Sequence, residues 1–322
     1  MTRSEITGEH KRDLLQNVRK QRLKYIAILP SLITLINGIC GFAAICFTSE
    51  GIEGNFELYK LDLPYFAVSG YLIFIAMVAD MLDGRVARMS HSTSSFGGQL
   101  DSLCDIISFG VAPAFLVFNI MDYKLTTLVD PAPFFSGFLQ RFIWLAAATY
   151  LVCAAIRLAR FNVENEEDET AHMNFIGLPT PAAAGVSASL VVFYQDVLLD
   201  GALQTVWQDS KIFDISETLI IFSLPFVTIA VAVLMISRVS FPHVLNHYMK
   251  GRKPLTHIVW GLIVICMIIW FLQAALVITF CGFAIFGYVK WIFGKVGKSG
   301  SSGVQGNEPP VLNITNDPDS DE

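Results

Sequence analysis

Long apolar segments alternate with short polar connections along most of the chain. Six of these segments are about as long as a helix that crosses the ~30 Å apolar core of a bilayer. They lie near residues 25–48, 64–82, 98–121, 140–157, 181–199 and 218–237. A seventh, 256–292, is too long for one helix, and Gln273 near its middle indicates two helices joined by a tight turn. The pattern predicts an all-α polytopic integral membrane protein with about eight transmembrane helices.

Composition and charge agree with this architecture. Of the 322 residues, 53% are hydrophobic and only 16% are charged, whereas about a quarter of a soluble domain is charged. Basic residues gather before the first segment and in the connections 83–97, 158–180 and 238–255, which the positive-inside rule assigns to the cytoplasm. We therefore expect both termini on the cytoplasmic side of a bacterial cytoplasmic membrane. The net charge of −6 comes from acids in a few blocks, and we expect no nucleic-acid partner.

The pattern divides the chain into four parts. Residues 25–237 are expected to form a six-helix core, and residues 238–293 two further transmembrane helices. Residues 294–322 are acidic and rich in Gly, Ser and Pro, which predicts a disordered cytoplasmic tail. Residues 1–24 are polar and basic, and fit either an amphipathic helix on an anionic leaflet or a solvated arm.

Four aspartates interrupt the apolar pattern at one place. Asp80 and Asp83 are three residues apart, and Asp101 and Asp105 are four apart, so each pair shares one face of a helix. The short polar connection MSHSTSSF (89–96) predicts that the two helices are antiparallel neighbours. The two carboxylate pairs are then expected at the same cytoplasmic depth, facing each other.

A cluster of acids at this depth requires a positive partner. Each acid costs ~2.5–3.5 kcal/mol at the centre of a bilayer and less near the interface. Hard divalent cations are the counter-charge that suits carboxylate ligands, and two of them on four carboxylates is an arrangement used for phosphoryl chemistry. The alternative is an ion pathway in an ion-coupled transporter. Such a transporter would need acids in opposed halves of an internal repeat, whereas these come from one helix pair.

The spacing Asp80-x2-Asp83-Gly84-x2-Ala87-Arg88-x8-Gly97-x3-Asp101-x3-Asp105 resembles, at all eight named positions, the motif of the CDP-alcohol phosphotransferases. The resemblance implies transfer of a CDP-linked group to an alcohol with release of CMP, at a site holding two divalent ions, Mg²⁺ or Mn²⁺. It also implies that the four aspartates bind the metals and that Asp105 doubles as the general base. PSLITLING (30–38) resembles the family's opening motif, except that Ser31 replaces an asparagine. The residues thereby implied to bind the CDP-linked donor are Thr34, Asn37, Gly84, Ala87, Arg88 and Gly97.

Three further stretches bear on the acceptor alcohol. DSLCDIISFGVAPA (101–114), IRLARFNVE (156–164) and NFIGLPTPAAAG (174–185) resemble the integral-membrane phosphatidylserine synthases. This implies CDP-diacylglycerol and L-serine as substrates, and relatives are often homodimers. Glycerol 3-phosphate or an inositol phosphate is the alternative acceptor.

Polar residues on these stretches are candidates for the acceptor site. Arg157, Arg160 and Asn162 are expected to bind the serine carboxylate, although the two arginines also fit topological anchors. In GLPTPAAAG, the two prolines at 179 and 181 predict the start of a helix, and Thr180 is a weaker ligand candidate.

Overall fold

The structure is a computed structural model of the chain. It describes residues 30–51, 55–58, 61–90, 95–128, 133–167, 175–195, 211–237, 240–241 and 271–301. The predicted N-terminal segment, most of the predicted tail and the first half of the long apolar stretch from 256 lie outside these residues.

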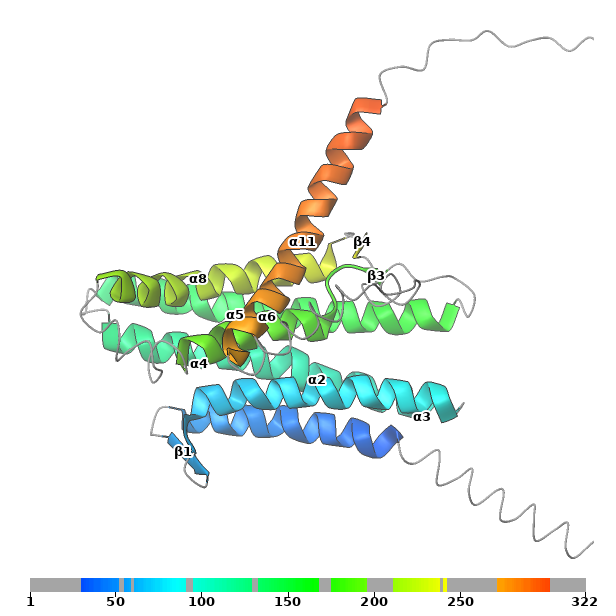
Figure 1. The fold of residues 1–322 in the computed structure, drawn as a ribbon, viewed down its shortest axis with the longest axis horizontal. Helices are drawn as coiled ribbons and strands as arrows, with labels where there is room; N and C mark the ends of the chain where they lie inside the picture. Colours follow the sequence, from blue (N-terminus) through cyan, green and yellow to red (C-terminus); the bar gives the residue numbers. More distant parts are fainter. Residues whose placement is uncertain are drawn as a thin grey trace, which may run out of the picture.

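Helices form nearly all of the described part, as the apolar pattern predicted (Figure 1). The helices are an unlabelled first helix Pro30–Glu50, α2 Tyr65–Ser90, α3 Ser95–Asp105, α4 Ala112–Leu128, α5 Pro133–Glu167, α6 Thr180–Phe193, α8 Lys211–Ile236 and α11 Leu272–Ser301. A π-helix, η1 Ile106–Val111, joins α3 to α4 without a break. Two short antiparallel pairs accompany them, β1 Asn55–Leu58 with β2 Leu61–Pro64, and β3 Phe175–Ile176 with β4 Ser240–Phe241.

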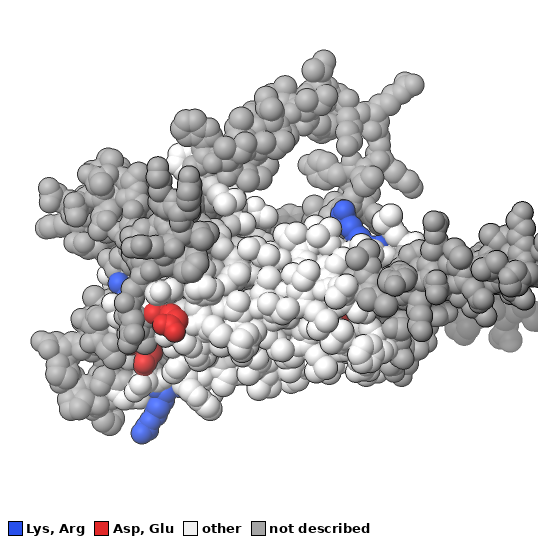
Figure 2. All heavy atoms as spheres, turned by 90° about the horizontal axis from the view of Figure 1, so that it is seen from below, with Lys and Arg blue, Asp and Glu red and all other residues white. Residues whose placement is uncertain are grey.

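Six continuous helices of the described part are long and apolar enough to cross a membrane, with α3, η1 and α4 together forming one of them. Helix α6 is a shorter apolar helix. The side chains of the first helix illustrate why such a helix suits a membrane. The buried face of the first helix carries Thr34, Asn37, Gly41, Ala44 and Thr48 at helical spacing. Its exposed face is also apolar, with Leu32, Ile36, Ile39 and Phe42 among the most exposed large side chains. Figure 2 shows one face of the described part, where a surface without Lys, Arg, Asp or Glu (white) lies between charged side chains near the two ends of the bundle. An apolar exterior around a partly polar interior is the arrangement of an integral membrane protein.

Some predicted bounds were wrong. The basic connection given as 83–97 is shorter in the structure, because α2 continues to Ser90 and α3 begins at Ser95. These ends agree with the polar joining stretch 89–96. The stretch Arg85-Val86-Ala87-Arg88 contains good helix formers, and the single Gly84 costs only ~1 kcal/mol relative to alanine. The β1–β2 hairpin and the π-helix were not predicted. The last helix, α11, begins beside Gln273, where a break was expected, and runs to Ser301, beyond the predicted boundary at 293.

Helix α6 lies inside the bundle and contacts α2, α4, α8, α11 and η1. Its small residues make this possible: Ala183, Ala184, Gly185 and Ala188 are all buried. The prolines predicted at its start are there, with Pro179 as the N-cap and Pro181 in the first turn. The end of α2, the start of α3 and the end of α5 lie at the end of the bundle opposite the β1–β2 hairpin (Figure 1).

Candidate active site

Three of the four motif aspartates meet where α2 ends and α3 begins. One carboxylate oxygen each of Asp80, Asp101 and Asp105 lies within 4.8 Å of the other two. Asp83 lies one turn along α2, is 4% exposed, and is close enough to interact electrostatically with all three. We call these four residues the acid cluster. The antiparallel pairing of the two helices thus brings together carboxylates that are up to 25 positions apart in sequence.

The acid cluster has the chemistry of a cation site. Its four negative charges repel one another in a setting partly removed from water, which raises the free energy unless a cation joins them. Asp83 Oδ2 and Asp101 Oδ1 are buried and have no hydrogen-bond partner among the described residues. Such oxygens are hard ligands, which suit divalent cations. The cluster can therefore bind a divalent metal ion.

The first helix supplies two polar side chains to the acid cluster. The Asn37 side-chain amide donates a hydrogen bond from Nδ2 to Asp105 Oδ1 at 2.9 Å. The Thr34 hydroxyl donates a hydrogen bond to the Pro30 carbonyl oxygen at 3.0 Å and lies near the Asp83 carboxylate. Both residues were expected to bind the donor substrate. Their contacts with acids of α2 and α3 were not predicted, since spacing along the first helix carries no information about its neighbours.

The small residues of the motif lie on the same two helices as the aspartates. Gly84 is exposed on α2, and a Cβ built there would have no atom within 4 Å, so this side of the helix is open. Ala87 and Gly97 are partly buried, on α2 and α3. Arg88 belongs to the last turns of α2, and its side chain lies outside the described part of the structure.

Residues near the C-terminal end of α5 are hydrogen-bonded to α6 and to α3. Arg157 Nη1 donates a hydrogen bond to Thr180 Oγ1 at 3.1 Å, in the first turn of α6. Asn162 Nδ2 donates to Ser102 Oγ at 2.8 Å, on the residue that follows Asp101. Arg160 is partly buried on the same helix. Ser102 was missed from sequence, because a serine beside a motif residue carries no signal of its own.

Comparison with known proteins agrees with this site. The family model described as CDP-alcohol phosphatidyltransferase matches residues 27–229. Three relatives are each named CDP-diacylglycerol–serine O-phosphatidyltransferase. The one from Helicobacter pylori is 28% identical over 80% of this chain and 94% of its own length. The relative from Bacillus subtilis is 29% identical over 68% of this chain and 92% of its own length. The relative from Methanocaldococcus jannaschii is 32% identical over 50% of this chain and 59% of its own length.

The matched region begins before the first described helix and ends within α8, so it contains the whole acid cluster and the helices that carry it. The helix α11 lies beyond it. Because the family model matches more than half of its length, this chain belongs to the CDP-alcohol phosphatidyltransferase family.

Proposed function

We propose that this membrane enzyme transfers the phosphatidyl group of CDP-diacylglycerol to L-serine, giving phosphatidylserine and CMP. The observation that carries the proposal is the convergence of Asp80, Asp101 and Asp105 at one end of the bundle, with Asp83 beside them. It is supported by relatives named for this reaction that align over most of their own length. The proposed catalytic core is residues 25–237, facing the cytoplasm from a bacterial cytoplasmic membrane.

The reaction forms one bond and breaks one. The serine hydroxyl oxygen bonds to the phosphorus that carries diacylglycerol, and the bond from that phosphorus to the bridging oxygen of CMP breaks. Asp105 takes the hydroxyl proton at Oδ2, because Oδ1 is occupied by the Asn37 amide. A positioned carboxylate of this kind contributes ~10²–10⁴-fold to the rate of such a proton transfer.

The acid cluster would hold two divalent ions, Mg²⁺ or Mn²⁺. When bound, these ions offset the negative charge of the diphosphate and polarise the reacting phosphorus. The four aspartates would hold them, and the carboxylates are well positioned for this because they lie on two packed helices rather than on loops.

The donor lies against the open side of α2. The bare surface at Gly84 leaves room for the nucleotide to approach the helix. Ala87, Gly97 and Thr34 are the further contacts proposed for the donor. Arg88 is the residue proposed to bind the diphosphate, for which a guanidinium is well suited. The acyl chains remain in the bilayer beside the exposed apolar faces of the helices.

The acceptor site is formed at the end of α5. Arg157, Arg160 and Asn162 lie within two turns of one another, and the carboxylate of serine suits a guanidinium fork. The hydrogen bond from Asn162 to Ser102 brings this end of α5 against the helix that carries Asp101. Serine bound there would be next to the acid cluster.

The test uses purified protein in detergent micelles with CDP-diacylglycerol and one acceptor at a time. Serine, glycerol 3-phosphate and an inositol phosphate are compared by CMP release and by the mass of the lipid product. We expect CMP and phosphatidylserine with serine alone. Release of CMP only with another acceptor would show that serine is not the substrate. No release of CMP with any of the three acceptors would contradict the proposal. The expected homodimer is tested by the mass of the solubilised protein, which a monomeric value would contradict.

A further inference from the structure

The carboxylate of Asp105 is held from one side by the first helix. The hydrogen bond from Asn37 Nδ2 to Asp105 Oδ1 is 2.9 Å long and joins residues 68 positions apart. Asn37 is 0% exposed and Asp105 is 8% exposed, so water does not compete with this bond. An aspartate side chain otherwise rotates over a broad range about its terminal torsion, and its two oxygens are equivalent. The amide of Asn37 makes them different.

Asn37 is itself held in place by η1, the π-helix that follows Asp105. The Ser108 hydroxyl donates a hydrogen bond to the main-chain oxygen of Asn37 at 2.9 Å, and Ser108 is fully buried. One turn further along the first helix, a Cβ added to Gly41 would lie 2.6 Å from Ser108 Cα. The backbones of the first helix and of η1 therefore approach closely, one turn from Asp105. This close approach fixes where the Asn37 side chain lies relative to the Asp105 carboxylate.

The backbone changes its winding immediately after Asp105. The π-helix η1 begins at Ile106 and includes Ser108 and Phe109. The fully buried Tyr150 of α5 donates a hydrogen bond from its hydroxyl to the Phe109 carbonyl oxygen at 3.0 Å. Single π-helical turns inside α-helices are frequent at functional sites. Here the turn is bonded on both sides, by Tyr150 and through Ser108 to Asn37, so Asp105 lies at the end of a braced segment.

We propose that Asn37 is a positioning residue, which holds Asp105 Oδ1 so that Oδ2 faces the acceptor hydroxyl, rather than a ligand of the donor. The inference rests on the proposed role of Asp105 as the base. A hydrogen bond already in place before the reaction spares the enzyme the cost of orienting that group in the transition state. The loss of Asn37 therefore lowers the rate of the chemical step and leaves donor binding nearly unchanged.

The experiment compares Asn37→Leu with the wild type, using the acceptor that the wild type uses best. Leucine has a similar branched shape and cannot donate a hydrogen bond. We expect kcat to fall about 10- to 100-fold while KM for CDP-diacylglycerol changes less than about twofold. Ser108→Ala, which loosens the support of Asn37 without touching Asp105, should lower kcat by a smaller factor in the same way. If Asn37→Leu unfolds, Asn37→Ser is assayed instead, because its short side chain cannot reach Asp105.

The matched control is Thr48→Val. Thr48 lies on the same buried face of the first helix, is also 0% exposed, and pairs with Ser69 Oγ at 2.7 Å, away from the acid cluster. The Thr48→Val substitution should lower the melting temperature without lowering kcat. A raised donor KM with unchanged kcat in Asn37→Leu would make Asn37 a donor ligand and overturn the proposal. An unchanged kcat and KM would overturn it too. If serine is not the acceptor, CMP release by the wild type with each acceptor shows this without any variant. If Asn37 does not position Asp105, the ratio of the variant kcat to the wild-type kcat shows it.

Discussion

Among single residues, Asp105 and Arg157 have the most clearly defined surroundings at the proposed site. Asp105 is almost fully buried, with one oxygen bonded to Asn37. Arg157 is partly buried and reaches from α5 to Thr180 on α6. Both side chains thus join helices, and the test of each is a substitution that preserves its shape or its charge while changing its chemistry.

Asp105→Asn should reduce CMP release by at least about 100-fold, because the amide cannot accept the hydroxyl proton. The protein should still insert and fold, since the volume is the same and Asn37 can still donate to the new side-chain oxygen. Detergent melting curves and CMP release check both points. The control is Asp122→Asn, at an acid on α4 that accepts a hydrogen bond from Gln140 outside the cluster. Near-normal turnover in Asp105→Asn would remove the base from the mechanism.

Arg157→Lys should raise KM for serine by about 10- to 100-fold and leave KM for CDP-diacylglycerol nearly unchanged. The reason is that a guanidinium makes two parallel bonds to a carboxylate and an ammonium does not. Losing one charge-assisted hydrogen bond costs ~1.5–3 kcal/mol, which corresponds to that change in affinity. Arg88→Lys should show the reverse pattern. Lysine satisfies the positive-inside rule equally well, so two unchanged constants for Arg157→Lys would identify a topological anchor.

Among the helices, α2 and α3 define the site, because each contributes two carboxylates from one face. The first helix packs on the π-helical segment that follows α3, with Gly41 against Ser108. Gly84, by contrast, faces open space on α2. The glycines near the site thus differ in purpose: one permits helix contact, and the other leaves a surface uncovered.

Removing divalent metal should stop turnover, and Mg²⁺ or Mn²⁺ should restore it. The physical reason is the mutual repulsion of four carboxylates on the α2–α3 pair, two of which carry buried oxygens with no partner in the described part of the protein. A ligand that binds only the folded state stabilises it, so the ion should also raise the melting temperature. Chelator titration followed by both measurements tests this. Full activity in metal-stripped protein would contradict the cation site.

Gly84→Ala should leave the melting temperature unchanged or slightly higher, because the new methyl group meets no atom and alanine favours the helix by ~1 kcal/mol. KM for CDP-diacylglycerol should nevertheless rise, since the methyl group occupies the proposed nucleotide surface. Gly98→Ala is the control, because its Cβ also meets nothing within 4 Å and the position lies outside the motif. If the two variants have equal KM values for CDP-diacylglycerol, Gly84 is not part of the donor site.

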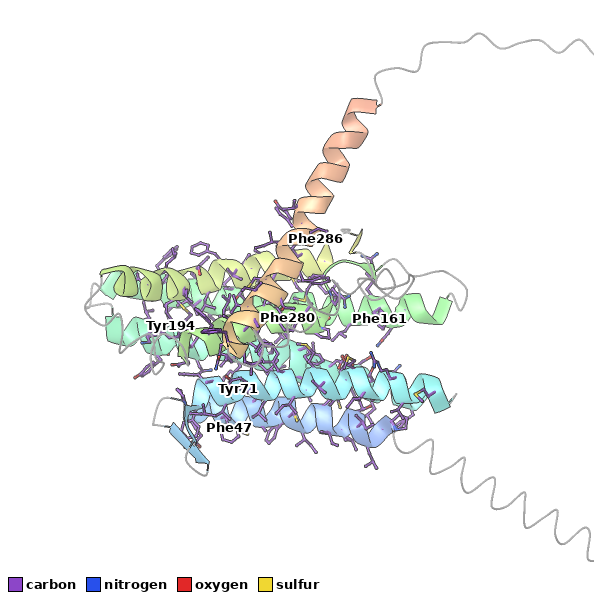
Figure 3. The ribbon with its side chains drawn as sticks, viewed as in Figure 1. Phe47, Tyr71, Phe161, Tyr194, Phe280 and Phe286 are labelled. Atoms are coloured by element: carbon purple, nitrogen blue, oxygen red, sulfur yellow. The ribbon has the colours of Figure 1, made fainter. Side chains whose placement is uncertain are left out.

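In the whole molecule, α11 packs against the core although it lies beyond the region matched by the family model. Phe280 lies 5.5 Å from Phe74 between ring centroids and against Gly185 of α6. Gln273 donates a hydrogen bond to the Tyr71 hydroxyl at 3.1 Å. Figure 3 shows Phe280 beside the bundle and Phe286 further along α11. These contacts make α11 a support for α6, whose first turn holds Thr180.

Phe280→Ala should lower the stability of the protein in detergent by ~1–3 kcal/mol, less than the ~3–5 kcal/mol typical of a fully buried phenylalanine. It should leave KM for both substrates nearly unchanged, because the acid cluster is elsewhere. Phe286→Ala, at a side chain 57% exposed on the same helix, should have little effect. Thermal unfolding of the two variants decides the matter, and equal melting temperatures would show that α11 does not support the core.

The sequence by itself determined what depends on local periodicity. Segment length predicted the membrane helices, and steps of three and four placed Asp80 with Asp83, and Asp101 with Asp105, on single helix faces. The short connection between the two helices then predicted that the pairs meet, and in the structure Asp80, Asp101 and Asp105 do so. Helical repeat and chain connectivity are properties of neighbouring residues, so they can be inferred without a fold.

Only the tertiary structure decided which helix supports which acid. The bonds from Asn37 to Asp105, from Asn162 to Ser102 and from Arg157 to Thr180 join different helices. Each depends on rotations and depths set by small residues, such as Gly41 against Ser108, and by the change of winding in η1. Because an apolar membrane helix can pack through several of its faces, its sequence does not specify these rotations. The packing of the whole bundle selects them, and with them the surroundings of Asp105.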